Sequence, residues 1–451
     1  MSRLNDIRHI YFIGIGGIGM SAIARYFHAN GAKVSGYDRT STVLTRELES
    51  EGMEIVYHDD PTTVKGMIDA VVYTPAIPKD NKVMQHFRIN GFSLLKRSDI
   101  LQLISEASFN ICIAGTHGKT TISTMTAHLL RDSGYGCNAF LGGISVNYNT
   151  NFWSSTNNVC VIEADEYDRS FLKLSPDIEV ISAMDADHLD IYGTAAEMEK
   201  AFIAFSARLK PGGVLLSRYG LKRTAELEAP VHFTYGVNEE KANVFAENIK
   251  ISDGSYVFDV FHDQWKLNGV QLNMGGMHNV ENSIAAIAIA HRLGIADDKI
   301  KSAVASFRGV KRRFEYIVKN NRQVYIDDYA HHPEELRALI SSAKNLFPGK
   351  KCTVIFQPHL FTRTRDLVDG FAESLSIADE IILLPIYPAR ELPIPGVTSE
   401  MIREKIKDKS VIILEKGRIT EWVAGRKPEF LITAGAGDID TLVKPLGEIL
   451  S

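Results

Sequence analysis

One segment constrains the fold of this chain more than any other. Residues 111–114 read Ile-Cys-Ile-Ala, a run typical of a buried strand, and Gly115-Thr-His-Gly118-Lys119-Thr120-Thr121 follows directly. The apolar residues after it share one helical face, which predicts a helix beginning at the lysine. A strand, a glycine-containing turn and a helix in this order present backbone N–H groups to an anion. The spacing predicts a compact phosphate loop, with Lys119 on the terminal phosphates and Thr120 or Thr121 on Mg²⁺.

The loop departs from the standard pattern, because Ile113 stands where the first glycine of a phosphate loop is expected. An ordinary tight corner between a strand and a helix would also use glycines. The Gly-Lys-Thr sequence between a predicted strand and a predicted helix is the context that favours nucleotide binding over such a corner.

Length and composition restrict the remaining possibilities. A chain of 451 residues with 45% apolar and 23% charged residues has the composition of a globular protein of about three domains. The net charge is −5 and no basic run occurs, so we expect no nucleic-acid partner.

We expect a cytoplasmic protein without a leader or a membrane span, because no apolar stretch is long enough. Its four cysteines form no Cys-x-x-Cys pair, which indicates buried free thiols rather than structural zinc.

Short apolar runs alternate with helical patterns along most of the chain, which predicts an α/β fold with mostly parallel sheets. Alternating polarity in residues 242–273 predicts a small antiparallel excursion. We expect three domains, 1–107, 108–312 and 313–451, with a hinge near residues 308–313. Strands are predicted at 9–13, 33–37, 70–73, 159–162, 179–183, 324–326, 353–356, 380–384 and 430–433, and helices at 17–29 and 279–293.

A second glycine-rich turn follows the first predicted strand. Gly14, Gly16 and Gly19 fit Gly-x-Gly-x-x-Gly, and Asp38 ends the next strand. Taken alone, this is the dinucleotide fingerprint with the aspartate on a ribose hydroxyl. Close packing of helix on strand is the alternative, and any diphosphate would suit the turn as well as NAD would.

Acidic residues follow two strands near the phosphate loop. Glu163 ends one strand and His188 follows another within Asp-Ala-Asp-His. Because Mg²⁺ takes few protein oxygens, these two residues could serve one or two ions that bridge a nucleotide. A helix cap or a structural histidine is the alternative.

Polar residues also gather after later strands. His278 and Asn282 open a helix, where they could cap it or contact an adenine edge. Asp-Asp-Tyr-Ala-His-His-Pro ends in a predicted helix start at Pro333, and Phe-Gln-Pro-His is followed by Arg363 and Arg365. The arginines suit a carboxylate or a phosphate.

Taken in order, these motifs resemble the Mur ligases, the ATP-dependent amino-acid ligases of peptidoglycan precursor synthesis. The resemblance covers essentially the whole chain. It rests on Gly-Ile-Gly-Gly-Ile-Gly-Met-Ser at 14–21, Ala-Gly-Thr-His-Gly-Lys-Thr-Thr at 114–121, Glu-Ala-Asp-Glu at 163–166, Ala-Asp-His-Leu-Asp at 186–190, His-Asn-x-x-Asn at 278–282, Arg-Arg-Phe at 312–314, Asp-Asp-Tyr-Ala-His-His-Pro at 327–333, Phe-Gln-Pro-His at 356–359 and Gly-Ala-Gly-Asp at 435–438.

The resemblance implies a Rossmann-like N-terminal domain for a UDP sugar, a central P-loop ATPase domain and a C-terminal Rossmann-like domain for the amino acid. The motifs are most similar to those of members that join L-alanine to the lactyl carboxylate of UDP-N-acetylmuramate through an acyl phosphate, giving ADP and phosphate. These members commonly carry arginine where this chain has Leu360, which leaves more of the alanine contact to Arg363. A monomer or homodimer is expected.

The resemblance also assigns roles to residues. It implies catalytic roles for Lys119, Glu163, His188 and His331; metal contacts for Thr120, Glu163 and His188; ATP contacts for Gly115, Thr116, His117, Gly118, Lys119, Thr120, Thr121, His278, Asn282 and Arg312 or Arg313; UDP-sugar contacts for Gly16, Gly17, Ile18, Gly19, Met20, Ser21, Asp38 and Thr74; and L-alanine contacts for His331, His359 and Arg363.

Three other functions fit part of the sequence. A sister ligase that joins a murein peptide to the same sugar nucleotide would share the phosphate loop and the acids. An NAD-dependent oxidoreductase would explain only the first glycine turn. A catalytically silent nucleotide-binding regulator would have no need of Lys119, Glu163 and His188 together.

Overall fold

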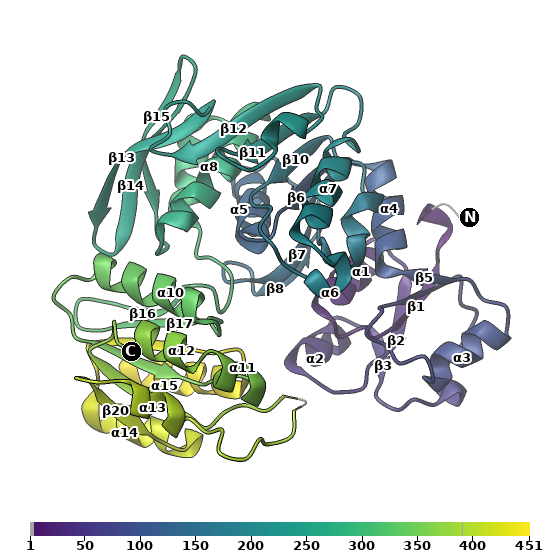
Figure 1. Cartoon of the computed structure of the whole chain (residues 1–451). Helices are drawn as coiled ribbons and strands as arrows, with labels where there is room; N and C mark the ends of the chain where they lie inside the picture. The colour runs from purple at the N-terminus through teal and green to yellow at the C-terminus, as the bar shows by residue number, and fades with distance from the viewer. Residues whose placement is uncertain (1–3, 390) are drawn as a thin grey trace. The chain divides into compact units, whose positions relative to one another are not determined.

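The computed structural model describes residues 4–389 and 391–451. Three β-sheets organise the chain (Figure 1). The chain forms two compact units: the first comprises Met1–Glu247, Asp259–Asn268 and Glu281–Val304, and the second Asn248–Phe258, Gly269–Val280 and Ala305–Ser451. Within the described ranges, no helix has the length and apolar character needed to cross a membrane. The four cysteines are buried and free, as the sequence predicts.

The first sheet is parallel and has the order β3-β2-β1-β4-β5. Its strands are β1 (His9–Ile13), β2 (Lys33–Tyr37), β3 (Glu54–Val56), β4 (Ala70–Tyr73) and β5 (Leu94–Lys96), and its helices are α1 (Ile18–Ala29), α2 (Val43–Ser50), α3 (Lys82–Ile89) and α4 (Arg97–Ala107). Successive residues of a strand face opposite sides of the sheet. Accordingly, Phe12 joins the core that contains α1 and α4, whereas Tyr11 lies 5.1 Å from Phe87 of α3. Helices therefore cover both faces.

The central sheet has ten strands in the order β15-β14-β13-β12-β11-β10-β6-β9-β7-β8. The strands are β6 (Phe109–Ala114), β7 (Asn138–Ser145), β8 (Thr150–Trp153), β9 (Val159–Glu163), β10 (Ile178–Ile181), β11 (Val214–Arg218), β12 (Val231–Val237), β13 (Val244–Ser252), β14 (Ser255–His262) and β15 (Trp265–Leu272). The helices between them are α5 (Lys119–Asp132), α6 (Leu189–Tyr192), α7 (Ala195–Ser206), α8 (Met277–Arg292) and α9 (Asp297–Ser306), with a 3₁₀ segment η3 (Tyr167–Lys173).

The register of this sheet brings three strand ends together. β6 pairs in parallel with β9, where Ile113 is opposite Glu163, and with β10, where Ala114 is opposite Ile181. The turn after β6, the acids after β9 and the residues after β10 therefore lie at one edge, where open α/β sheets bind ligands. The predicted strand at 179–183 ends two residues early, because the Ser182 hydroxyl turns to the carbonyls of Ala114 and His117.

The antiparallel excursion predicted within residues 242–273 corresponds to β13, β14 and β15. Two residues join each consecutive pair of these strands, a connection that only antiparallel strands allow. The first turn is Asp253-Gly254, and both residues have positive φ (48° and 67°) as a type I′ hairpin turn requires.

The third sheet has the order β16-β17-β21-β18-β19-β20 and is parallel except for the β16–β17 pair. Its strands are β16 (Glu315–Lys319), β17 (Val324–Asp328), β18 (Cys352–Phe356), β19 (Glu380–Leu383), β20 (Ser410–Ile413) and β21 (Phe430–Ala434). Its helices are α10 (Pro333–Leu346), α11 (Phe361–Asp366), α12 (Val368–Leu375), α13 (Glu400–Lys405), α14 (Ile419–Arg426) and α15 (Val443–Leu450). Tyr325, Ile355 and Leu431 form one core with Val423 of α14 and Leu446 of α15.

Candidate active site

The phosphate loop connects β6 to α5, and two of its glycines have positive φ, +131° at Gly115 and +81° at Gly118. A Cβ on Gly115 would lie 2.2 Å from the Ser182 hydroxyl oxygen. The loop therefore passes so close to the end of β10 that only glycine fits there. Gly118 is the N-cap of α5 and brings no side chain to the helix start, where backbone N–H groups favour an anion.

The two residues between these glycines are held by the segment after β10. Thr116 accepts a 3.1 Å hydrogen bond at its hydroxyl oxygen from the Asp185 N–H. The His117 carbonyl accepts from the Ser182 hydroxyl, while its imidazole is exposed and lies 3.9 Å from Asp185. The loop is thus fixed to the segment after β10 through the Thr116 hydroxyl and the His117 carbonyl, whereas the His117 side chain contributes little to its shape.

Thr120 and Thr121 lie in the first turn of α5, and both are buried. The Thr120 hydroxyl donates to Glu163 Oε1 over 2.9 Å. The Gly142 N–H donates to the other oxygen of Glu163 over 2.9 Å, and a Cβ on Gly142 would lie 2.4 Å from that carboxylate. Glu163 is therefore held at the start of α5 by groups from two further elements.

Lys119 pairs with an acid that sequence reasoning did not select. Its ammonium group donates to the Gly115 carbonyl over 2.6 Å and to Glu166 Oε1 over 2.7 Å. Burial raises the pKa of Glu166, and the Lys119 charge opposes that rise. The signal was in the sequence, because Glu166 ends the same Glu-Ala-Asp-Glu run as Glu163.

Glu166 also belongs to the group of side chains best suited to a metal. The His188 Nε2 atom lies 3.8 Å from Glu166 Oε1 and 3.7 Å from Asp187 Oδ2, and one ligand atom from each of the three lies within 4.8 Å of the others. Two carboxylates and one imidazole are a donor set that a hard divalent ion accepts alongside water and phosphate. Of these three residues, the sequence predicted only His188 as a metal ligand, and the structure adds Glu166 and Asp187 as candidates.

The first glycine loop is held by the residue that ends β2. Asp38 Oδ2 accepts a 2.8 Å hydrogen bond from the Gly16 N–H, so this oxygen helps to fix the loop. A Cβ on Gly16 would lie 2.9 Å from the same oxygen, and one on Gly14 would lie 3.0 Å from Thr74 Cγ2. Gly17 is the N-cap of α1 and supplies no side-chain cap.

Two predicted UDP-sugar residues direct their side chains into the protein. Met20 is buried in the core, and the Ser21 hydroxyl donates to the Ile18 carbonyl over 2.9 Å while it accepts from Asn151 over 2.9 Å. What this loop can offer a ligand is its backbone, because among the described residues no acceptor is assigned to the N–H groups of Ile18 and Gly19.

The helix α8 carries His278 and Asn282 one turn apart. A Cβ on Gly118 would lie 2.7 Å from Asn282 Oδ1, so this amide lies against the phosphate loop. His278 packs on Gly276, where burial lowers the pKa of its imidazole.

The three residues predicted to bind L-alanine come together in the second unit. The rings of His331 and His359 are 6.1 Å apart, and Arg363 Nη1 lies 3.3 Å from His359 Nδ1. Burial lowers the pKa of His359, with further lowering from Arg363 and His331. Leu360 has a φ of +71° and precedes α11, so the chain turns sharply before the helix that carries Arg363.

Arg312 makes its contacts at the end of β17. Its Nε lies 3.4 Å from Asp327 Oδ2, its guanidinium also donates to the Gly435 carbonyl, and the ring of Tyr329 lies 5.1 Å away. The charge of Arg313 lowers the pKa of Asp328, although burial has the larger effect and raises it to about 6.

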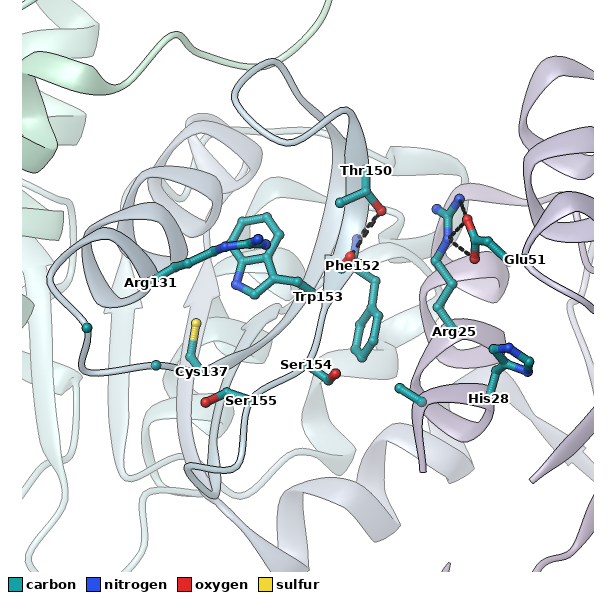
Figure 2. Close-up of a pocket in the computed structure, with 13 residues that line it drawn as sticks. Arg25, His28, Glu51, Arg131, Cys137, Thr150, Phe152, Trp153, Ser154 and Ser155 are labelled. Carbon is teal, nitrogen blue, oxygen red and sulfur yellow. Dashed lines mark hydrogen bonds and ion pairs between the residues drawn. The ribbon is translucent and has the colours of Figure 1, made fainter. Parts of the chain in front are cut away.

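A cavity of about 680 Å³ lies away from all these residues, where α1 and α5 end rather than where they begin (Figure 2). Arg25 and Glu51 form a 2.6 Å ion pair beside it. The Arg131 guanidinium lies 4.1 Å from the centre of the Tyr148 ring and 5.4 Å from that of Trp153. None of the residues predicted from the sequence lines this cavity.

The phosphate loop, its lysine and the acids bonded around it define a P-loop nucleotide-binding enzyme of the α/β class. The chain belongs to the Mur ligase family. Family models match it over residues 9–108 (Mur ligase family, catalytic domain), 113–290 (Mur ligase middle domain) and 312–437 (Mur ligase, glutamate ligase domain). The predicted three-domain α/β class is confirmed, and the ATP dependence of this family agrees with the phosphate loop.

Relatives align with the chain over nearly its full length. The UDP-N-acetylmuramate–L-alanine ligase of Cytophaga hutchinsonii is 46% identical over 98% of this chain and 97% of its own, and that of Parabacteroides distasonis is 47% identical over 99% and 98%. The crystal structure of UDP-N-acetylmuramate-alanine ligase MurC from Thermotoga maritima superposes with a TM-score of 0.83, at 29% identity and 98% coverage of both chains. A murein peptide ligase from Psychrobacter arcticus has a TM-score of 0.66 at 22% identity, covering 98% of this chain and 100% of its own.

Proposed function

We propose that this chain joins L-alanine to the lactyl carboxylate of UDP-N-acetylmuramate with conversion of ATP to ADP and phosphate. A carboxylate oxygen attacks the γ-phosphorus of ATP, the bond to the β-phosphate oxygen breaks, and an acyl phosphate and ADP result. The neutral amine of L-alanine then attacks the acyl carbon, phosphate leaves, and the nitrogen loses a proton. The product is an amide in the synthesis of a peptidoglycan precursor.

The observation that carries this proposal is the full-length similarity to relatives named for this reaction, at 46% and 47% identity. Relatives at 46% and 47% identity are named for ligation of L-alanine, which favours an amino acid over a peptide as the second substrate. Membership of the Mur ligase family excludes the oxidoreductase interpretation of the first glycine loop.

The contacts of the phosphate loop support roles for its residues. Lys119 would neutralise phosphoryl charge that develops during transfer. Thr120 and Glu163 would hold one Mg²⁺ ion, and His188 with Glu166 and Asp187 would hold a second. When bound, such ions draw charge from the phosphate oxygens. The oxygen-rich donor set around Glu166 fits this assignment.

The remaining site residues take their proposed roles from the family. Asn282 and His278 would contact the base or ribose of ATP, and Arg312 or Arg313 its phosphates. His331, His359 and Arg363 would receive L-alanine, whose carboxylate suits the guanidinium of Arg363. The backbone of residues 16–19 would hold the diphosphate of UDP-N-acetylmuramate at the start of α1.

Phosphate release by the purified full chain tests the proposal directly. The assay combines ATP, Mg²⁺ and UDP-N-acetylmuramate with L-alanine, glycine, L-serine or L-alanyl-γ-D-glutamyl-meso-diaminopimelate in separate reactions. We expect the largest kcat/KM with L-alanine. A larger value with the tripeptide would establish the sister ligase instead, and no release with any acceptor would favour the silent regulator.

A further inference from the structure

Arg97 is a cation that none of the motifs above includes, and it lies between two of them. It is the first residue of α4, which follows the last strand of the first sheet. Its Nη2 donates a 3.2 Å hydrogen bond to Asp165 Oδ2, inside the Glu-Ala-Asp-Glu run. Its Nη1 lies 2.6 Å from where a Cβ on Gly19 would stand. The guanidinium therefore joins the first glycine loop to the acids beside the phosphate loop.

The position of Arg97 at Gly19 is electrostatically unusual. Gly19 is the second residue of α1, and the amino terminus of a helix carries a partial positive charge that disfavours a cation. Gly17 provides no side-chain cap, and the Ile18 and Gly19 amides have no assigned acceptor in the described part of the chain. Several donors and a full positive charge thus converge at one place, an arrangement that a bound anion stabilises.

Asp165 orients this guanidinium but leaves part of it free. The carboxylate of Asp165 is itself fixed by a 3.0 Å hydrogen bond from the Tyr167 N–H. It binds only Nη2 of Arg97, and Nη1 and Nε donate no hydrogen bond to any described residue. The Arg97 side chain is 25% exposed, so its remaining N–H groups can reach a ligand. A planar guanidinium matches a phosphate with two parallel hydrogen bonds.

We propose that Arg97 binds the diphosphate of the sugar nucleotide at the start of α1, oriented by Asp165. The proposal rests on the proposed function, because the diphosphate at that loop is part of it. Gly19 then lacks a side chain for two reasons. The ligand can approach the backbone closely, and the Arg97 guanidinium occupies the space that a Cβ would take. Arg97 thereby links binding of the sugar nucleotide to the segment that carries Glu163 and Glu166.

The test measures binding of UDP and of uridine to the full chain by calorimetry. We expect Arg97→Ala to weaken UDP binding about ten- to hundredfold, the range for a lost hydrogen bond to a charged group, and to leave uridine binding unchanged. Arg97→Lys keeps the positive charge but lacks the planar guanidinium, so its UDP affinity should lie between those of the wild type and Arg97→Ala. Gly19→Ala should resemble Arg97→Ala, because its methyl group displaces the guanidinium.

Lys173→Ala is the matched control. Lys173 of η3 pairs with Asp99 of α4, so it connects α4 to the same segment after β9 through a similar ion pair. The three atoms nearest to a Cβ on Gly19 all belong to Arg97 and none to this pair. We expect it to bind UDP as the wild type does. Equal UDP affinity in wild type and Arg97→Ala, or an equal loss in Lys173→Ala, would overturn the inference. UDP binding is measured separately from turnover. If the proposed function is wrong, the wild-type protein will bind UDP but release no phosphate, which distinguishes that failure from failure of this inference.

Discussion

The hydroxyl of Thr120 and the carboxylate of Glu163 share a 2.9 Å hydrogen bond although 43 residues separate them in the chain. Thr120 is the second residue of α5 and Glu163 ends β9, and the parallel pairing of β6 with β9 brings them together. A hydroxyl and a carboxylate at the start of a phosphate-binding helix are the protein oxygens that Mg²⁺ would use.

Glu163→Gln should therefore raise the Mg²⁺ concentration needed for half-maximal phosphate release by at least about tenfold. The amide keeps the size of the side chain and removes its charge. Ser123→Ala is the control, because Ser123 approaches the other oxygen of Glu163 at only 3.4 Å and should matter little. Identical Mg²⁺ titrations for wild type and Glu163→Gln would mean that this pair is structural.

Lys119→Ala should reduce turnover by about 10²–10³-fold, the range for losing a group that stabilises transition-state charge. UDP binding should be unchanged, since the lysine belongs to the phosphate loop and not to the first glycine loop. Phosphate release gives the first quantity and calorimetry with UDP the second. Turnover near the wild-type rate would contradict the role given to Lys119.

Gly115→Ala should destabilise the fold more than Gly134→Ala. Both glycines have positive φ, and strain costs an alanine about 1–3 kcal/mol in such a conformation. A Cβ at Gly134 meets nothing within 4 Å, whereas one at Gly115 also collides with Ser182. Denaturant unfolding of the two variants checks the order. Equal free energies of unfolding would show that the loop can move away from β10.

Arg363→Ala should raise the KM for L-alanine about ten- to hundredfold and leave the KM for UDP-N-acetylmuramate unchanged. Arg365→Ala is the control in the same helix, because Arg365 is half-exposed and pairs with Asp366. Initial rates at varied L-alanine give both constants. If the two variants have the same KM for L-alanine, Arg363 does not receive the amino acid.

Asp327 should make stability depend on pH. Burial raises its pKa to about 7, although the Thr433 hydroxyl and Arg312 favour the charged form. The folded chain then holds a proton that the unfolded chain releases near pH 4, so this residue stabilises the fold at low pH and loses that effect as pH rises to 7. Thermal unfolding should show the Tm of wild type falling relative to Asp327→Asn between pH 5 and 8. A constant difference would mean that Asp327 is ionised throughout.

The sequence was sufficient for features that depend on local pattern. The strands that end at Ile13, Tyr37 and Tyr73 are predicted to the residue, because a glycine, an aspartate or Thr-Pro follows the last strand residue in each case. The pairing of acids with the phosphate loop followed from the rule that parallel strands end at one edge. The domain boundaries and the residue roles stay predictions.

The sequence could not predict contacts between distant segments when no general rule of sheet topology brings those segments together. Arg97 meets Asp165 across 68 residues of chain, and neither residue type is unusual at its position. Glu166 was visible in its motif, but only the structure shows that Lys119 bonds to it rather than to Glu163. Likewise, only the structure shows that the Asp38 carboxylate accepts a hydrogen bond from the Gly16 amide.

The Lys119–Glu166 ion pair has a consequence for the order in which the site is loaded. Glu166 is fully buried and accepts from the very ammonium group that a terminal phosphate requires. An arriving phosphate must compete with this internal carboxylate, and once the lysine changes partner a buried negative charge is left uncompensated. On the proposed function, a divalent cation at Glu166 would offset that charge. We therefore expect nucleotide and metal to bind together, with the metal taking the place of Lys119 beside Glu166.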